Sequence, residues 1–149
     1  MSNGPFDISA VITRLKTLVP ALKLVQGSAD LATAVTSGAP QTPMAFVLLA
    51  AEQAPQTYGS SEAHVQTVRT TINVVFAVRN YRATELGAQV SDDLNAIVTA
   101  SRDAILGWAP NTYYSNFELA GGRLDNYTNA TAWWVEAYSI NYFLRVMPQ

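Results

Sequence analysis

The chain has 149 residues, no cysteine, a net charge of −2 and only 13% Asp, Glu, Lys and Arg. This length fits one domain, residues 1–149, with room for a hydrophobic core, and the lack of cysteine excludes disulfides, thiolate metal sites and cysteine nucleophiles. The opening residues, Met-Ser-Asn-Gly-Pro, lack the basic and apolar regions of a signal peptide, and no apolar run reaches the about 20 residues that span a bilayer, so we expect a soluble protein with no membrane partner.

The first part of the chain predicts a helix, a short strand and a second, shorter helix. Apolar residues recur at helical spacing over residues 8–19, where Asp7 is placed to cap the helix and Pro20 to end it. Residues 22–27 (LKLVQG) are typical of a short strand, and residues 29–35 (ADLATAV) of a short helix.

Two strands separated by a long loop follow. Residues 44–53 (MAFVLLAAEQ) are apolar on both faces, as in a central strand. Residues 54–63 are rich in turn-forming types and predict a loop. Residues 65–79 alternate as a half-buried strand does, although Val75 and Ala77 interrupt its polar face. The apolar face of that strand is expected to hold Val68, Thr70, Ile72, Val74, Phe76 and Val78.

The strongest helical pattern in the chain begins at a capping Thr84 and is ended by Gly107 and Pro110. A short strand at 117–120 then leads into a polar loop, residues 121–131, which opens on a Gly-Gly turn signal. Residues 132–145 are rich in aromatic and β-branched types and predict a final strand. Neighbours on a strand point to opposite faces, so one of Trp133 and Trp134 should pack under the helices and the other should face outward, towards another strand, a subunit or solvent.

These elements predict an α+β fold in the order α-β-(α)-β-β-α-β-β. We expect one mainly antiparallel or mixed sheet of four to five strands, with the two main helices packed on one face. A compact chain of this length is roughly 38 Å across, whereas fifteen strand residues span roughly 50 Å. The long strands must therefore either bend through bulges or project as a ribbon.

The low charge content has two explanations. Charged residues are depleted at the centres of protein interfaces, so other subunits would cover much of this surface; alternatively, Ser, Thr, Asn and Gln make the surface soluble. The nine basic residues form no stripe, which argues against sequence-specific binding to nucleic acid.

No combination of residues predicts catalysis, a cofactor or a metal. His64 is the only histidine, so a catalytic site would have to combine it with Ser60, Ser61 or Glu62. Asp125, Asn126 and Asn129 offer oxygen ligands for a cation, but not at the spacing of a known calcium loop.

The segment FELAGGRLDNYTNATAWWVEAYSINYFLR resembles the C-terminal part of phage tail terminator proteins. Earlier segments resemble the same family in the same order: LVQGSADLATAV, PMAFVLLAAEQA, TVRTTINVVFAVRNY and ELGAQVSDDLNAIVTASRDAILGW. The resemblance covers nearly the whole chain and lies in the succession of elements, because no single motif is diagnostic. One departure is Tyr138, where the family pattern has phenylalanine.

The resemblance implies a structural virion protein without enzyme activity, assembled in the cytoplasm of a bacterial host. Proteins of this family form a hexameric ring on the head-proximal end of the tail tube, stop its polymerisation and join the tail to neck or head-completion proteins. DNA passes through the ring without being read.

Alternatives of the same structural class are another neck, head–tail joining or tail-completion protein, or a tail tube subunit; an enzyme using His64 belongs to a different class. We expect interface residues on the loops and at the ends of the long strands. They are Tyr58, His64, Arg79, Asn80, Tyr81, Arg123, Tyr127 and Trp133.

Overall fold

The computed structural model describes residues 3–39, 41–59, 63–79, 88–128 and 131–147. Their elements follow in the order α1 (Ser9–Leu18), β1 (Leu24–Gln26), α2 (Ser28–Ser37), β2 (Met44–Gly59), β3 (His64–Arg79), α3 (Ala88–Ile105), β4 (Glu118–Thr128) and β5 (Thr131–Val146). The strands form one sheet in the order β1-β2-β3-β5-β4, in which β1 is parallel to β2 and the other pairs are antiparallel. The predicted α+β fold, the order of its elements and its mixed sheet are confirmed.

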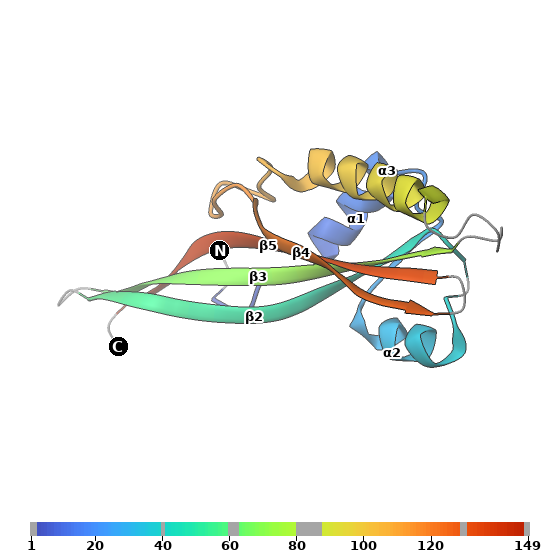
Figure 1. Ribbon diagram of the computed structural model, residues 1–149. Coiled ribbons are helices and arrows are strands. Elements are labelled where there is room, and N and C mark those ends of the chain that lie inside the picture. Colours follow the sequence, from blue (N-terminus) through green and yellow to red (C-terminus); the bar gives the residue numbers. More distant parts are fainter. Residues whose placement is uncertain (1–2, 40, 60–62, 80–87, 129–130, 148–149) are drawn as a thin grey trace.

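The helices cover both faces of one half of the sheet (Figure 1). α1 and α3 lie together on one face, here named the α1/α3 face, as expected for the two main helices. α2, which has ten residues like α1, lies on the opposite face, named the α2 face. α1 starts where the Asp7 carboxylate accepts a hydrogen bond of 3.0 Å from the backbone N–H of Ser9, which lowers the pKa of Asp7. α3 ends before Gly107, whose φ of +76° suits the predicted role of that residue as a helix stop; Thr84 lies outside the described residues.

Alternation along β3 divides the core into two parts. Ile72, Val74 and Phe76 point to the α1/α3 face and pack against residues of α1 and α3. Val75 and Ala77, which interrupt the expected polar face, point to the α2 face and join a second core there. The interruption is therefore explained by α2, because this helix covers the far side of the strand at that position.

The two tryptophans of β5 lie on opposite faces, as predicted. Trp134 packs against the core of the α1/α3 face. Trp133 belongs to the core of the α2 face and is only 7% exposed. The ring of Trp133 packs against another strand. It stacks on the ring of Phe46 of β2 at a centroid distance of 6.3 Å and an interplanar angle of 22°.

Both predicted loops next to the long strands are largely wrong. Residues 54–59 continue β2, and residues 121–128 continue β4. Turn-forming residues are accommodated because the pairing registers are shifted between Gln53 and Gln56 in β2 and twice in β4. Such bulges absorb residue types that a regular ladder excludes, and edge strands tolerate them best.

The long strands both bend through these bulges and project beyond the helices (Figure 1). We call the projecting part the distal ribbon: residues 52–59 of β2, 64–70 of β3 and 140–146 of β5. The segment before α1 lies against it. The backbone N–H of Phe6 donates to Glu52 Oε2 at 3.4 Å, and the side chain of Asn3 exchanges hydrogen bonds of 3.2 and 3.4 Å with the backbone of Arg145.

Candidate interaction surface

β4 forms one edge of the sheet, and no described strand pairs with its outer side. β4 lies beside β5 from Glu118, opposite Ser139, to Thr128, opposite Thr131. Unpaired backbone groups on an edge strand can bind another strand. One pocket on the α2 face is lined in part by β4, and another on the α1/α3 face lies between α3 and β5, the strand next to β4.

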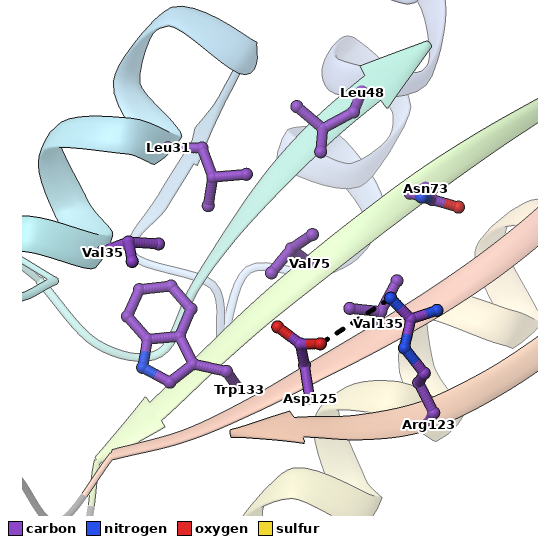
Figure 2. A pocket seen from close by; sticks show the side chains of 9 residues that line it. All are labelled: Leu31, Val35, Leu48, Asn73, Val75, Arg123, Asp125, Trp133 and Val135. Atoms are coloured by element: carbon purple, nitrogen blue, oxygen red, sulfur yellow. Dashed lines mark ion pairs between the residues drawn. The ribbon is translucent and has the colours of Figure 1, made fainter. Parts of the chain in front are cut away.

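The pocket on the α2 face has a volume of about 240 Å³ and lies between α2 and the strands (Figure 2). Its lining is mostly apolar and comprises Leu31, Val35, Leu48, Asn73, Val75, Arg123, Asp125, Trp133 and Val135. Arg123 and Asp125 of β4 form an ion pair at 3.7 Å across one side of the pocket. Because both side chains are more than half exposed, this pair neutralises local charge but adds little stability.

α2 is held to the sheet by few side chains. Ala34 is its one buried residue, and Val35 leaves 63% of its surface exposed although it faces the pocket. A ten-residue helix is marginal by itself in water and depends on tertiary packing. The apolar side chains of α2 are therefore only partly covered by the rest of the described chain.

The pocket on the α1/α3 face has a volume of about 300 Å³ and lies between α3 and Trp134. Its lining comprises Leu94, Asn95, Val98, Arg102 and Trp134. On the same face, Leu119 and Leu124 of β4 lie opposite Tyr138 and Trp134 of β5. These leucines are 41% and 55% exposed, so α3 does not cover the β4 side of the sheet.

A buried ion pair joins α3 to the sheet beside this second pocket. The carboxylate of Glu136 is fully buried and accepts hydrogen bonds from the Arg102 guanidinium, the shortest at 2.7 Å, and from the indole N–H of Trp134 at 2.8 Å. The hydrogen bond that Arg102 donates to Glu136 raises the pKa of the Arg102 guanidinium. A Cβ atom at Gly122 would lie 2.9 Å from Trp134 Cζ2, so the position opposite Glu136 accommodates the indole ring only because it lacks a side chain.

Two aromatic hydroxyls of β5 differ in their surroundings. The hydroxyl of Tyr138 is buried and has no hydrogen-bond partner among the described residues; burial, and then the charge of Glu136, raise the pKa of Tyr138 well above its ordinary value. The hydroxyl of Tyr142 donates to a carboxylate oxygen of Glu52 at 2.9 Å.

We expect Tyr138→Phe to leave the free energy of unfolding unchanged or to raise it by about 1 kcal/mol, because the substitution removes a buried hydroxyl without a partner. Tyr142→Phe is the matched control and should lower it by about 1–2 kcal/mol, because Glu52 loses a hydrogen bond. Urea unfolding of both variants measures the difference. An equal loss of stability in the two variants would contradict this interpretation of Tyr138.

The residues predicted for an interface fall into two separate regions. Arg123 and Trp133 line one pocket, and the backbone of Tyr127 lies next to them in β4, opposite Ala132. Arg79 ends β3 at the same end of the sheet. At the opposite end, the backbones of Tyr58 and His64 lie near the tip of the distal ribbon.

Asn80 and Tyr81 lie outside the described residues, as do the side chains of Tyr58 and Tyr127. His64 is exposed, with its Nε2 atom 3.3 Å from the side-chain oxygen of Gln66. Ser60, Ser61 and Glu62, which an enzyme using His64 would need, also lie outside the described residues.

The sequence interpretation missed the leucines of β4, the contribution of α2 to the pocket and the buried ion pair. Leu124 stands between charged residues in GRLDNY, and Glu136 is the one acid within the apolar run WWVEAY. The second is a signal, because an isolated acid in a buried strand needs a cation nearby; the first is not, because single apolar residues are common on protein surfaces.

Neither a metal site nor a membrane-spanning helix is found among the described residues. Among the described residues, no group of three or more His, Asp or Glu side chains is arranged to hold a metal ion. In the same part of the chain, every helix is too short or too polar to cross a membrane.

Known proteins resemble this chain in sequence and in fold. A family model described as "Phage tail terminator protein" matches residues 1–148. A chain from a solved structure described as "Virion of native gene transfer agent (GTA) particle" shares the fold with a TM-score of 0.51 and 13% identity, over 91% of this chain and 93% of that chain. No curated protein matches the chain.

Proposed function

Since the chain belongs to the phage tail terminator protein family, whose members are structural proteins of the virion tail, we propose that it caps the head-proximal end of the tail tube. It acts as a ring, hexameric as in the family, which stops polymerisation of the tube and binds neck or head-completion proteins. The protein has no catalytic role and needs no cofactor. DNA passes through the ring without sequence-specific contacts.

The distal ribbon is the observation that best supports an assembly role. It projects beyond the helices (Figure 1), and its end exposes Phe143, Val146 and Met147, each by more than 40%. Phe143 and Val146 lie three residues apart on one regularly paired strand and therefore point to opposite faces, so each face of the ribbon end carries an exposed apolar side chain. A projecting ribbon with exposed apolar residues is suited to contact a neighbouring subunit or the tube.

A cap that stops growth needs two different surfaces. Its lower side must bind the end of the tube as another tube subunit would, and its upper side must not repeat that surface, because a repeating heterologous contact generates an open filament. The interface residues predicted above divide accordingly. Tyr58 and His64 at the ribbon tip belong to one contact, and Arg79, at the opposite end of β3, belongs to the other.

The test is to add the purified protein to tail tubes that are still polymerising. We expect growth to stop at a shorter mean tube length, with one ring at one end of each tube in negative-stain electron micrographs. A tube subunit would instead extend the tubes. A neck or joining protein that acts later would bind finished tails and leave the length distribution unchanged, and either result would contradict the capping role.

A further inference from the structure

We propose that the β4 side of the molecule is the surface on which the next copy of this chain docks, by adding the outer edge of its β2 to β4. We name this surface the β4 margin: the outer edge of β4, its exposed Leu119 and Leu124, and the pocket on each face. The proposal rests on the proposed ring, because it states how neighbouring subunits of that ring make contact.

The β4 margin is incomplete on three sides at once. Within the described chain the outer backbone edge has no partner strand, the pocket on the α2 face is open beside Val35, and the α1/α3 face leaves both leucines of β4 exposed. A strand sends successive side chains to opposite faces of a sheet. An added strand would therefore fill both sides and pair the edge, whereas a helix docked on one face would leave the other open.

A second copy carries a strand that fits. Beyond the three residues paired with β1, the outer edge of β2 has no described partner strand; the stretch from Val47 to Ala54 can pair with an added strand, and Pro55, which has no N–H, ends it. Leu48 and Leu49 of this edge lie opposite Asn73 and Ile72 of β3, and therefore point to the two different faces. Leu49 is exposed and can contact the β4 margin on the α1/α3 face, whereas Leu48 is half-buried and packs against its own chain's core under α2.

Strand direction and charge agree with this pairing. β2, β3, β5 and β4 alternate in direction across the sheet, so β4 runs opposite to β2, and a neighbour with the same orientation presents its β2 antiparallel to β4. Antiparallel pairs form the more stable ladder. Arg123 and Asp125 of the margin neutralise each other, and Glu52 of the β2 edge is already bound by Tyr142, so the pairing is not opposed by like charges.

The two edges lie on opposite sides of one sheet, so their contact is heterologous and repeats from copy to copy. Rotation about a common axis then closes a ring. Pairing of β4 with β4 would instead be a two-fold contact, which ends at a dimer.

The first test is Leu124→Asp, measured by mass photometry with and without tail tubes. A charge in the contact should raise the protein concentration needed for half-maximal ring formation at least tenfold, while the circular dichroism spectrum and unfolding midpoint stay close to those of the unsubstituted protein. Leu18→Asp is the matched control, because Leu18 is exposed to a similar degree on α1, and it should not affect the ring.

Normal ring formation by Leu124→Asp would overturn the proposal that the next copy docks on the β4 margin and would leave the capping proposal standing. An unsubstituted protein that forms no ring even on tubes would overturn the capping proposal itself.

The second test uses the absence of native cysteine. Leu49 and Leu124 are exposed on the same face of the sheet, at its two opposite edges. A Leu49→Cys, Leu124→Cys double variant treated with a flexible bismaleimide should give a ladder of products beyond the dimer. Leu124→Cys alone should remain a monomer on a denaturing gel. Efficient cross-linking of that single variant to a dimer, or no ladder from assembled rings of the double variant, would overturn the pairing of β2 with β4.

Discussion

Glu136→Ala is expected to lower the free energy of unfolding by about 3 kcal/mol, measured by urea denaturation. The substitution leaves Arg102 without its buried partner and leaves the indole N–H of Trp134 without its acceptor. It also opens a cavity between α3 and the sheet, because Glu136 is completely buried. The loss should lie at the lower end for broken buried ion pairs, because the Arg102 side chain is 37% exposed and can reach water.

Two further variants separate the causes of that loss. Glu118→Ala removes an exposed acid of β4 and should change the free energy of unfolding by no more than about 0.5 kcal/mol. Glu136→Gln keeps the size of the side chain and an acceptor for Trp134 while removing the charge, so its loss should lie between the other two. If Glu136→Ala were as stable as Glu118→Ala, the ion pair would not be what joins α3 to the sheet.

Trp133→Ala is expected to destabilise the fold by about 3–5 kcal/mol. Trp133 is nearly fully buried and stacks on Phe46, and its removal would join its own volume to the existing pocket under α2. α2 has little other support, since Ala34 is its one buried residue. Hydrogen exchange should therefore show the amides of α2 losing protection before those of β3 and β5.

Val35→Ala is the control for that experiment. It shortens a side chain of the same pocket that is mostly exposed, and it should change the stability by no more than about 0.5 kcal/mol. If Trp133→Ala lost stability without any earlier loss of protection in α2, the helix would be held by contacts other than the tryptophan.

The alternating strands were predictable because apolar and polar residues alternate in the sequence as buried and exposed side chains alternate on a strand. The residues expected on the apolar face of β3 are buried, and the two that interrupted its polar face lie under α2. The opposite placement of Trp133 and Trp134 follows from the same two-residue period. Such patterns depend on local geometry alone, which a single sequence contains.

The extensions of β2 and β4 were not predictable in this way. Gly121 and Gly122 read as a turn, yet they continue a strand, and the reason at Gly122 is the indole ring of Trp134 above it. That contact joins residues of two strands and exists only after they pair. Pro55 and its neighbours are likewise tolerated in β2 because its outer edge has no partner strand in the described chain and its register is shifted there.

The role of the predicted interface residues stays a prediction, although two of them can be placed on one surface. Arg123 and Trp133 were expected at an interface and line one pocket, because β4 and β5 place them on the same face of adjacent strands. The contribution of α2 to this pocket depends on how a short helix packs against a distant part of the chain. Neither the spacing nor the composition of residues 28–37 indicates which face of the sheet the helix will cover.

The position of β5 also affects how the molecule folds. β5 follows β3 and β4 in the chain but lies between them in the sheet, so its pairing partner β3 comes from a part of the chain before α3. Sheets that contain such non-local pairs fold more slowly than helical domains. β4 and β5 are joined as a hairpin at Thr128 and Thr131, so the hairpin docks on β3 as a unit, and until it does β3 lacks one of its two neighbours and is open to aggregation. The newly made chain therefore depends on a late, long-range step to protect the strands that the finished sheet encloses.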